Sequence, residues 1–306
     1  MGQVLVLGLI SGGIYALFAL GVVLVYRGTG VLTFAQGEIG TAALFLAAYL
    51  VTDRGYPWVV GAAAALVFAT GIGCLFEFAV VRRMVGGDPV SVAVATVGLG
   101  LFLLALEFRL FGDTPQQLAG PVEGGITIAG VIVTPTQIAA LVIALALGFG
   151  LQAVLRRTDF GLGILAAAQD PSATRLVGVP LAKITLTVWG AGAALSAVAA
   201  LLVEPTVGVF QPGYASELFV VGLAAAVVGG LTSLPGAVVG GVIIGLAESA
   251  ATRYLGDLNI PGLRYVVVLT ILLVALLGRQ LWPDVVRRLG PPATTTPARE
   301  TAGASA

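Results

Sequence analysis

Long apolar runs dominate the chain. Six of them approach or exceed about 20 residues, the length that a helix needs to cross the hydrocarbon core of a bilayer. These runs lie at 4–26, 57–81, 89–110, 129–154, 182–204 and 262–282. Three others, at 36–52, 217–229 and 236–252, are shorter or interrupted by glycine. The pattern predicts eight or nine membrane-spanning segments, some of them Gly-interrupted or re-entrant.

The predicted fold is an all-α polytopic membrane bundle. Inside lipid every backbone polar group needs a partner, and the alternating polar and apolar residues of a membrane barrel are missing, so the spans must be helices. Composition agrees, because 58% of the residues are hydrophobic and 10% are charged, against roughly 25% charged in a soluble domain. We expect one transmembrane domain at 1–289 and a disordered cytoplasmic tail at 290–306, which is rich in Pro, Thr and Ala.

Basic residues predict the orientation, since short cytoplasmic loops are enriched in Lys and Arg. With the N-terminus outside and nine crossings, eleven basic residues fall on the cytoplasmic side and four fall outside. The outer four are Arg54, Arg109, Arg253 and Arg264. Treating 217–252 as a re-entrant hairpin on the outer side moves none of them, so the number of spans stays open. The first basic residue is Arg27, so the first run is expected to remain as a span and not to be a cleaved signal peptide.

Residue usage excludes several classes of function. The sequence has no histidine and a single cysteine, which argues against zinc, haem, disulfides and Ser-His-Asp catalysis. Fifteen basic and fifteen acidic residues balance, so no nucleic-acid partner is expected. The chain also lacks the P-loop pattern, and therefore any ATP that drives it must be used by another protein. We expect no enzyme activity and no cofactor bound by this chain.

The stretch GTGVLTFAQGEIG, at 28–40, places polar side chains between two apolar runs. Broken helices with glycine expose backbone dipoles to the substrates of transporters. Thr33, Gln36 and Glu38 are therefore candidates for a translocation path. The alternative for Glu38 is that its charge favours the N-terminus of a helix, and the sequence leaves both open.

A second stretch, GGLTSLPGAVVGGVIIGLAES at 229–249, combines a Gly-Pro turn with small residues at helical spacing. Small residues let membrane helices approach closely. The turn and packing candidates are Gly229, Gly230, Pro235, Gly236 and Gly240. Helix packing is the favoured interpretation for these glycines.

A third stretch, Arg156 to Lys183, is the longest polar segment on the predicted cytoplasmic side. Its centre, 166–177, has the composition of a short helix. Asp170 and Pro171 predict a cap followed by proline at the first helical position, and Gly178 predicts the helix end. Such a helix is suited to docking a soluble partner; with only Arg175 exposed on it, docking on lipid is disfavoured.

Three motifs in this order resemble the branched-chain amino-acid permeases of bacterial ABC importers. They are GGIYALFALGVVLVYRGTGVLTFAQGEIG, FGLGILAAAQDPSATRLVGV and AAAVVGGLTSLPGAVVGGVIIGLAES. The resemblance covers nearly the whole chain and implies a subunit of the bacterial inner membrane that works by alternating access. It also implies several partners: ABC ATPase subunits, a second permease that is a paralogue or a second copy, an extracytoplasmic substrate-binding protein and membrane lipid.

In that family the middle motif is the loop that couples the permease to the ATPase. The resemblance places this role on Ala168, Gln169, Asp170, Pro171 and Gly178, with Arg175 on the same helix. The family commonly has Glu where this chain has Gln169, and often His where it has Gln36. Both differences weaken any inference about the ligand. Alternatives are a permease for urea, short amides or simple sugars, a gradient-driven transporter, and, least favoured, a facilitator channel.

Overall fold

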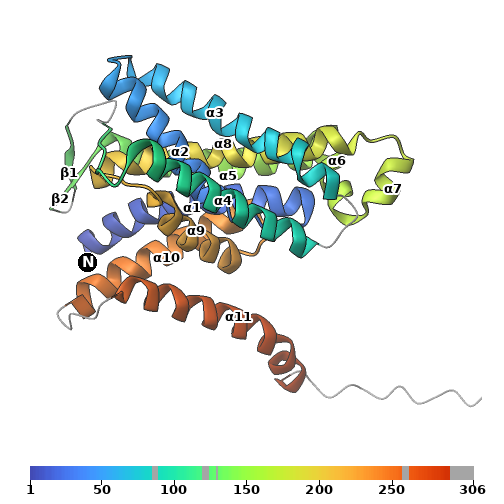
Figure 1. Cartoon of the computed structure of the whole chain (residues 1–306). Helices are drawn as coiled ribbons and strands as arrows, with labels where there is room; N and C mark the ends of the chain where they lie inside the picture. The colour runs from blue at the N-terminus through green and yellow to red at the C-terminus, as the bar shows by residue number, and fades with distance from the viewer. Residues whose placement is uncertain (85–88, 119–123, 129, 257–261, 290–306) are drawn as a thin grey trace, which may run out of the picture.

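The computed structural model describes residues 1–84, 89–118, 124–128, 130–256 and 262–289, and in these ranges the chain is almost entirely helical (Figure 1). The predicted tail at 290–306 lies outside the described residues. The longer helices are α1 (Gly2–Thr29), α3 (Trp58–Ala79), α4 (Pro89–Phe111), α5 (Pro135–Arg157), α8 (Leu181–Val207), α10 (Leu234–Leu255) and α11 (Leu263–Leu289). The shorter ones are α2 (Gln36–Ala48), η1 (Tyr49–Asp53), η2 (Val81–Met84), α6 (Asp159–Gln169), α7 (Pro171–Leu176) and α9 (Tyr214–Gly229).

Six of the described helices are long and apolar enough to cross a membrane, and α9 and the apolar part of α11, Leu263–Leu277, are shorter. The predicted all-α polytopic fold is confirmed. These six helices correspond to the six strongest apolar runs of the sequence, except that α10 takes the place of the run at 262–282. The weak run at 236–252 belongs to α10, which has 22 residues, because the helix begins before Gly236 and continues through the more polar residues after Glu248.

A small β-hairpin precedes α5 and corrects the prediction of a span from 129. Strands β1 (Ile126–Ile128) and β2 (Val131–Val133) pair antiparallel, with Thr127 opposite Ile132. Helix α5 starts only at Pro135, because Thr134 and Gln137 form a capping box around its first turn. The sequence contains the residues of this capping box, but the apolar residues before Thr134 lengthen the apolar run, and the predicted span therefore began too early.

Helix α1 forms the centre of the bundle and packs against α5, α8, α9 and α10. Its middle residues are buried on every side; Leu17, Phe18 and Leu20 have no exposed surface. A helix that is apolar all round belongs in the interior of a bundle. The other long helices therefore arrange themselves around α1.

Glycines set the distance between α1 and α10. A Cβ atom added to Gly12 would lie 2.7 Å from the Cα of Val242, and one added to Gly241 would lie 2.7 Å from the backbone nitrogen of Ala16. Gly8 and Gly245 make the same kind of backbone contact one turn away. The two antiparallel helices thus touch backbone to backbone along a Gly-xxx-Gly face on each.

A second glycine contact joins α9 to the start of α10. Gly229 faces the backbone of Gly236, and Gly240 faces that of Ala225. Gly230 ends α9 with a φ of 85°, a conformation open mainly to glycine. Ser233 then caps α10 by accepting a hydrogen bond of 3.0 Å from Gly236 N, with Pro235 in the first turn. The second glycine stretch therefore packs against two different helices.

Helix α11 lies at the periphery, where it packs against α9 and α10, and a polar cluster around Glu248 also joins it to α1. Arg264 pairs with Glu248 on α10 at 3.1 Å, and the Tyr15 hydroxyl on α1 donates to Glu248 at 2.6 Å. Arg264 also donates to the Tyr15 oxygen at 2.9 Å. Glu248 therefore links three helices, α1, α10 and α11.

The elements at the two ends of the bundle differ in kind (Figure 1). The N-terminus and the β-hairpin lie at one end, and α6 and α7 lie at the other. The first is called the N-terminal end below, and the second the α7 end.

Gly241→Leu tests the contact between α1 and α10. Because the new side chain would meet backbone that has no room to move, we expect the free energy of unfolding to fall by about 1–3 kcal/mol or more. Thermal denaturation of the detergent-solubilised protein, followed by size-exclusion chromatography, measures this. Gly150→Ala is the control, since nothing lies within 4 Å of a Cβ there; equal stability of both variants would contradict the close contact.

Candidate functional site

The chain breaks its helical course between α1 and α2, deep inside the bundle. Gly30 ends α1 with a φ of 71°, and the following residues run without regular structure to Gln36. Phe34 N donates to the Thr96 hydroxyl of α4 at 3.0 Å, which gives one freed backbone group a partner. Thr33 and Gln36 are each only 2% exposed. The break therefore brings backbone and polar side chains into the interior.

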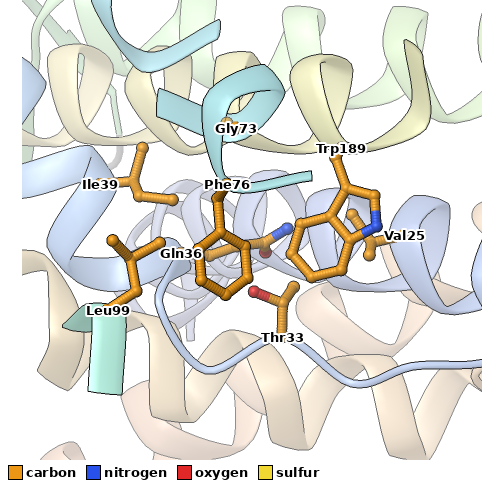
Figure 2. Close-up of a pocket in the computed structure, with 9 residues that line it drawn as sticks. Val25, Thr33, Gln36, Ile39, Gly73, Phe76, Leu99 and Trp189 are labelled. Atoms are coloured by element: carbon orange, nitrogen blue, oxygen red, sulfur yellow. The ribbon is translucent and has the colours of Figure 1, made fainter. Parts of the chain in front are cut away.

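Thr33 and Gln36 line the same small cavity (Figure 2). Its other walls are apolar and include Phe76 from α3, Leu99 from α4 and Trp189 from α8. The rings of Phe76 and Trp189 lie 5.6 Å apart between their centroids. The cavity has a volume of about 10 Å³, which is at the lower limit for one water molecule. The site is thus assembled from five helices, α1, α2, α3, α4 and α8, and from the segment that joins α1 to α2.

The carboxamide of Gln36 has no hydrogen-bond partner among the described residues, although both its oxygen and its nitrogen are buried. Figure 2 shows this amide beside the rings of Phe76 and Trp189, with the Thr33 hydroxyl directed toward the same space. Buried polar groups in folded proteins are nearly always paired. Gln36 is therefore held in an environment that a purely structural side chain would avoid.

Glu38 lies elsewhere, between α2, α4 and α9. Its Oε1 accepts a hydrogen bond of 2.6 Å from the Ser216 hydroxyl, and its side chain also contacts Glu107 of α4. Glu107 in turn accepts from Gly213 N at 3.2 Å. Both carboxyl groups thus lie at the N-terminus of α9, where helix dipoles favour negative charge.

Glu38 occupies the first turn of α2 but does not cap that helix. Of the two possibilities that the sequence left open, the contacts of Glu38 agree with a role at a helix N-terminus, although the helix is α9 and not α2. Glu38 does not line the cavity of Gln36, and its place on a translocation path stays a prediction. Glu107 was missed by the sequence analysis, since it sits in an apolar run near Arg109 and resembles a residue at the edge of the membrane. Only the packing of α4 against α2 shows that it is 3% exposed.

A third buried carboxyl group organises the α7 end. Glu77 of α3 has no exposed surface; it pairs with Arg82 at 3.0 Å and accepts from the Thr185 hydroxyl of α8 at 2.7 Å. Arg82 also donates to the carbonyl of Ala182 at 3.3 Å. Together these contacts fix the start of α8 to the end of α3.

The contact of Glu77 with Arg82 and Thr185, called the Glu77 junction below, is directly connected to the cavity. Phe76 precedes Glu77 in α3, and Trp189 lies one turn beyond Thr185 in α8. Gly73 of α3 packs close to the carbonyl of Trp189, where a Cβ would come within 2.6 Å. A displacement of the start of α8 would therefore also displace Trp189 and so change the aromatic wall of the cavity.

The predicted coupling residues lie on and around α7, which protrudes from the bundle (Figure 1). Asp170 caps α7 by accepting from Ala173 N at 3.0 Å, Pro171 begins the helix, and Gly178 follows it with a φ of 81°. Ala168 and Gln169 belong to the end of α6, so the expected helix at 166–177 is split at Asp170.

The surface of this segment combines charge with bare apolar residues. Ala168, Gln169, Asp170, Arg175 and Gly178 are all exposed. Leu176 and Val177 are 90% and 76% exposed, although both are large and apolar. Exposed apolar side chains at the tip of a projection are typical of a surface that binds another protein.

Comparison with known proteins identifies the family. Residues 4–277 match the model of the "Branched-chain amino acid transport system / permease component" family. The chain belongs to this family. No solved structure matches the chain.

Individual relatives agree with this assignment. The permease protein BraD of the high-affinity branched-chain amino acid transport system of Pseudomonas aeruginosa is 33% identical over 269 residues, 83% of this chain and 87% of the relative. LivH, its counterpart in Escherichia coli, is 27% identical over 89% of this chain and 94% of the relative. A probable branched-chain amino acid permease, LivH of Methanocaldococcus jannaschii, is 27% identical over 84% of each chain. The fold and the family together make this chain a multi-pass membrane permease of an ABC transport system.

Arg82→Ala tests the junction at Glu77. Because it leaves a fully buried carboxylate with one donor fewer, we expect the free energy of unfolding to fall by about 1–3 kcal/mol. The neighbouring Arg83 is exposed, and Arg83→Ala should change stability by less than about 0.5 kcal/mol. Thermal denaturation of the two purified variants measures the difference, and equal melting temperatures would show that the pair contributes nothing.

Proposed function

We propose that the chain is one of two permease subunits in an ATP-driven importer of branched-chain amino acids. The match to the permease family over 4–277 carries this proposal, and the names of the relatives supply the substrate. The protruding α6–α7 segment supports the importer class. Because the sequence has no P-loop, ATP would be bound and hydrolysed by separate ATPase subunits, and this chain would not act as an enzyme.

The proposed role of α7 is to receive the motion of the ATPase subunits. Leu176 and Val177 offer an apolar contact, and Asp170 and Arg175 flank it with charge. Force on α7 would pass to α8, which follows within five residues of the helix end. The hydrogen bonds of Glu77 would then transmit it to α3, and both helices carry a wall of the cavity.

The proposed orientation puts the α7 end in the cytoplasm of a bacterial cell. Arg27, Arg82 and Arg156 all lie at helix termini on this end, as the distribution of basic residues in inner-membrane proteins favours. The N-terminal end would face a substrate-binding protein outside. Substrate would then pass by alternating access, with Thr33 and Gln36 on the path and Glu38 nearer the outer end.

One observation favours a second class, a gradient-driven transporter. Glu38, Glu77 and Glu107 all lie in the interior, and such groups serve as proton relays in pumps and transporters. In that class the cytoplasmic helix α7 would have no role in energising transport. The two classes therefore differ in their response to changes at α7.

Asp170→Lys is the decisive variant. It removes the α7 cap and reverses a charge on the docking surface, so we expect leucine uptake to fall at least tenfold while the protein still inserts into the membrane. Affinity purification from the native cell with mass spectrometry should recover P-loop ATPases with the wild type and fewer with the variant. Arg83→Ala, at the same end, is the control. Normal uptake by Asp170→Lys, or purification without an ATPase, would favour the gradient-driven transporter.

Cysteine labelling tests the orientation. In a Cys74→Ser background, which removes the single native cysteine, we introduce Tyr56→Cys near the N-terminal end and Arg175→Cys on α7. Both positions are exposed. A membrane-impermeant maleimide should label Tyr56→Cys in intact spheroplasts and Arg175→Cys only after lysis. The reverse pattern would invert the proposed topology.

A further inference from the structure

The unpaired carboxamide of Gln36 requires an explanation. Burying an amide without a hydrogen bond destabilises a protein by about 1–3 kcal/mol. A leucine at position 36 would fill similar space without this penalty. The chain instead keeps an amide whose oxygen and nitrogen both lack partners among the described residues, and the Thr33 hydroxyl in the same cavity also makes no hydrogen bond to them.

Two glycines keep space around this amide. A Cβ atom on Gly21 of α1 would lie 3.0 Å from the Gln36 oxygen, and one on Gly192 of α8 would lie 3.2 Å from its nitrogen. Any larger residue at these positions would press on the amide. Gln36 is thus surrounded by backbone that leaves its polar atoms accessible to a small group from the cavity.

The chemistry of the cavity restricts what it can bind. The carboxamide is neutral and offers both a donor and an acceptor, and the hydroxyl of Thr33 adds either. The lining contains no charged side chain, and Phe76, Leu99, Ile39 and Val25 provide an apolar wall. A ligand without net charge, with a polar head and an aliphatic tail, satisfies both parts. A zwitterionic aliphatic amino acid has these properties, whereas urea has no tail for the apolar wall and glutamate carries an extra charge.

We propose that Gln36 and Thr33 form a binding site within the permease for the zwitterionic head group of an aliphatic amino acid, whose side chain rests on Phe76 and Leu99. This site rests on the proposed function and assigns substrate recognition to the permease in addition to the binding protein. The cavity of about 10 Å³ is too small for such a ligand, so binding requires its walls to move apart.

The aromatic pair identifies the wall that must open. Phe76 belongs to α3 and Trp189 to α8, so the cavity enlarges if the two rings separate from Gln36 on α2. Both rings lie within one turn of the Glu77 junction and hence close to α7. Nucleotide-driven motion at α7 would reach this wall before any other part of the site.

Photo-leucine, a leucine analogue whose side chain carries a diazirine, tests the site directly. The complete importer, purified with its partners, is reconstituted in proteoliposomes and irradiated during ATP turnover, and labelled peptides are identified by mass spectrometry. We expect label on the peptides that contain Phe76, Leu99 or Trp189. Excess leucine or valine should abolish it, and urea or glutamate should leave it unchanged.

Variants connect the label to the polar groups. Gln36→Leu should reduce labelling at least tenfold, and Thr33→Val should reduce it less, since one of several hydrogen bonds is lost. Ser196→Ala is the matched control: Ser196 is buried in α8, bonds only the carbonyl of Gly192 in its own helix, and does not line the cavity. Its labelling should equal that of the wild type.

Other results would overturn the proposal in distinguishable ways. Label confined to other segments, or unchanged in Gln36→Leu, while ATP-driven uptake of photo-leucine proceeds, removes the site and leaves the importer intact. Competition by urea as strong as that by leucine removes the aliphatic amino acid as its ligand. Failure of the wild-type complex to hydrolyse ATP or to take up leucine or photo-leucine removes the importer function and the site together.

Discussion

Close backbone contact between α1 and α10 is the constraint on which the rest of this bundle depends. Within a bilayer the hydrophobic effect does not draw helices together, so association relies on van der Waals packing and on a few polar links. Glycines at positions 8, 12, 241 and 245 bring the two helices together without intervening side chains. The middle of helix α1 thereby becomes a buried axis, and the positions of α5, α8 and α9 follow from their contacts with it.

Polar groups are distributed in this bundle according to a simple rule: each buried charge has a task at a helix terminus. Glu77 holds the start of α8, and Glu38 and Glu107 receive donors from the start of α9. These termini are the places where an apolar interior leaves backbone groups without partners. Gln36 differs from these carboxyl groups, since neither its oxygen nor its nitrogen has a hydrogen-bond partner among the described residues.

The arrangement also relates the projecting helix α7 to the interior. Helix α7 is too short to form a stable unit by itself, and it leads through Gly178 directly into α8. Because α8 is bound to α3 by Glu77 and by the close approach of Gly73 to Trp189, the two helices are suited to move as one body. The cavity lies between this pair and the segment around Gln36 on α2. A small shift at the α7 end therefore has a direct geometric consequence at the polar cavity.

The sequence by itself determined the class of fold, most of the spans and the motifs of the family, because these depend on local properties: apolar length, glycine, proline and caps. It also placed Thr33 and Gln36 near a helix break and Asp170 at the start of a short helix. It did not identify the carboxylate of Glu107, the partners of Glu38 and Glu248, or the β-hairpin before α5. Only the tertiary structure decided these, since whether a polar residue is buried, and which group meets it, depends on helices that are distant in the chain. The separation of Gln36 from Glu38, two residues apart in sequence, has the same origin: on a helix they point to different sides, and packing alone determines what each side faces.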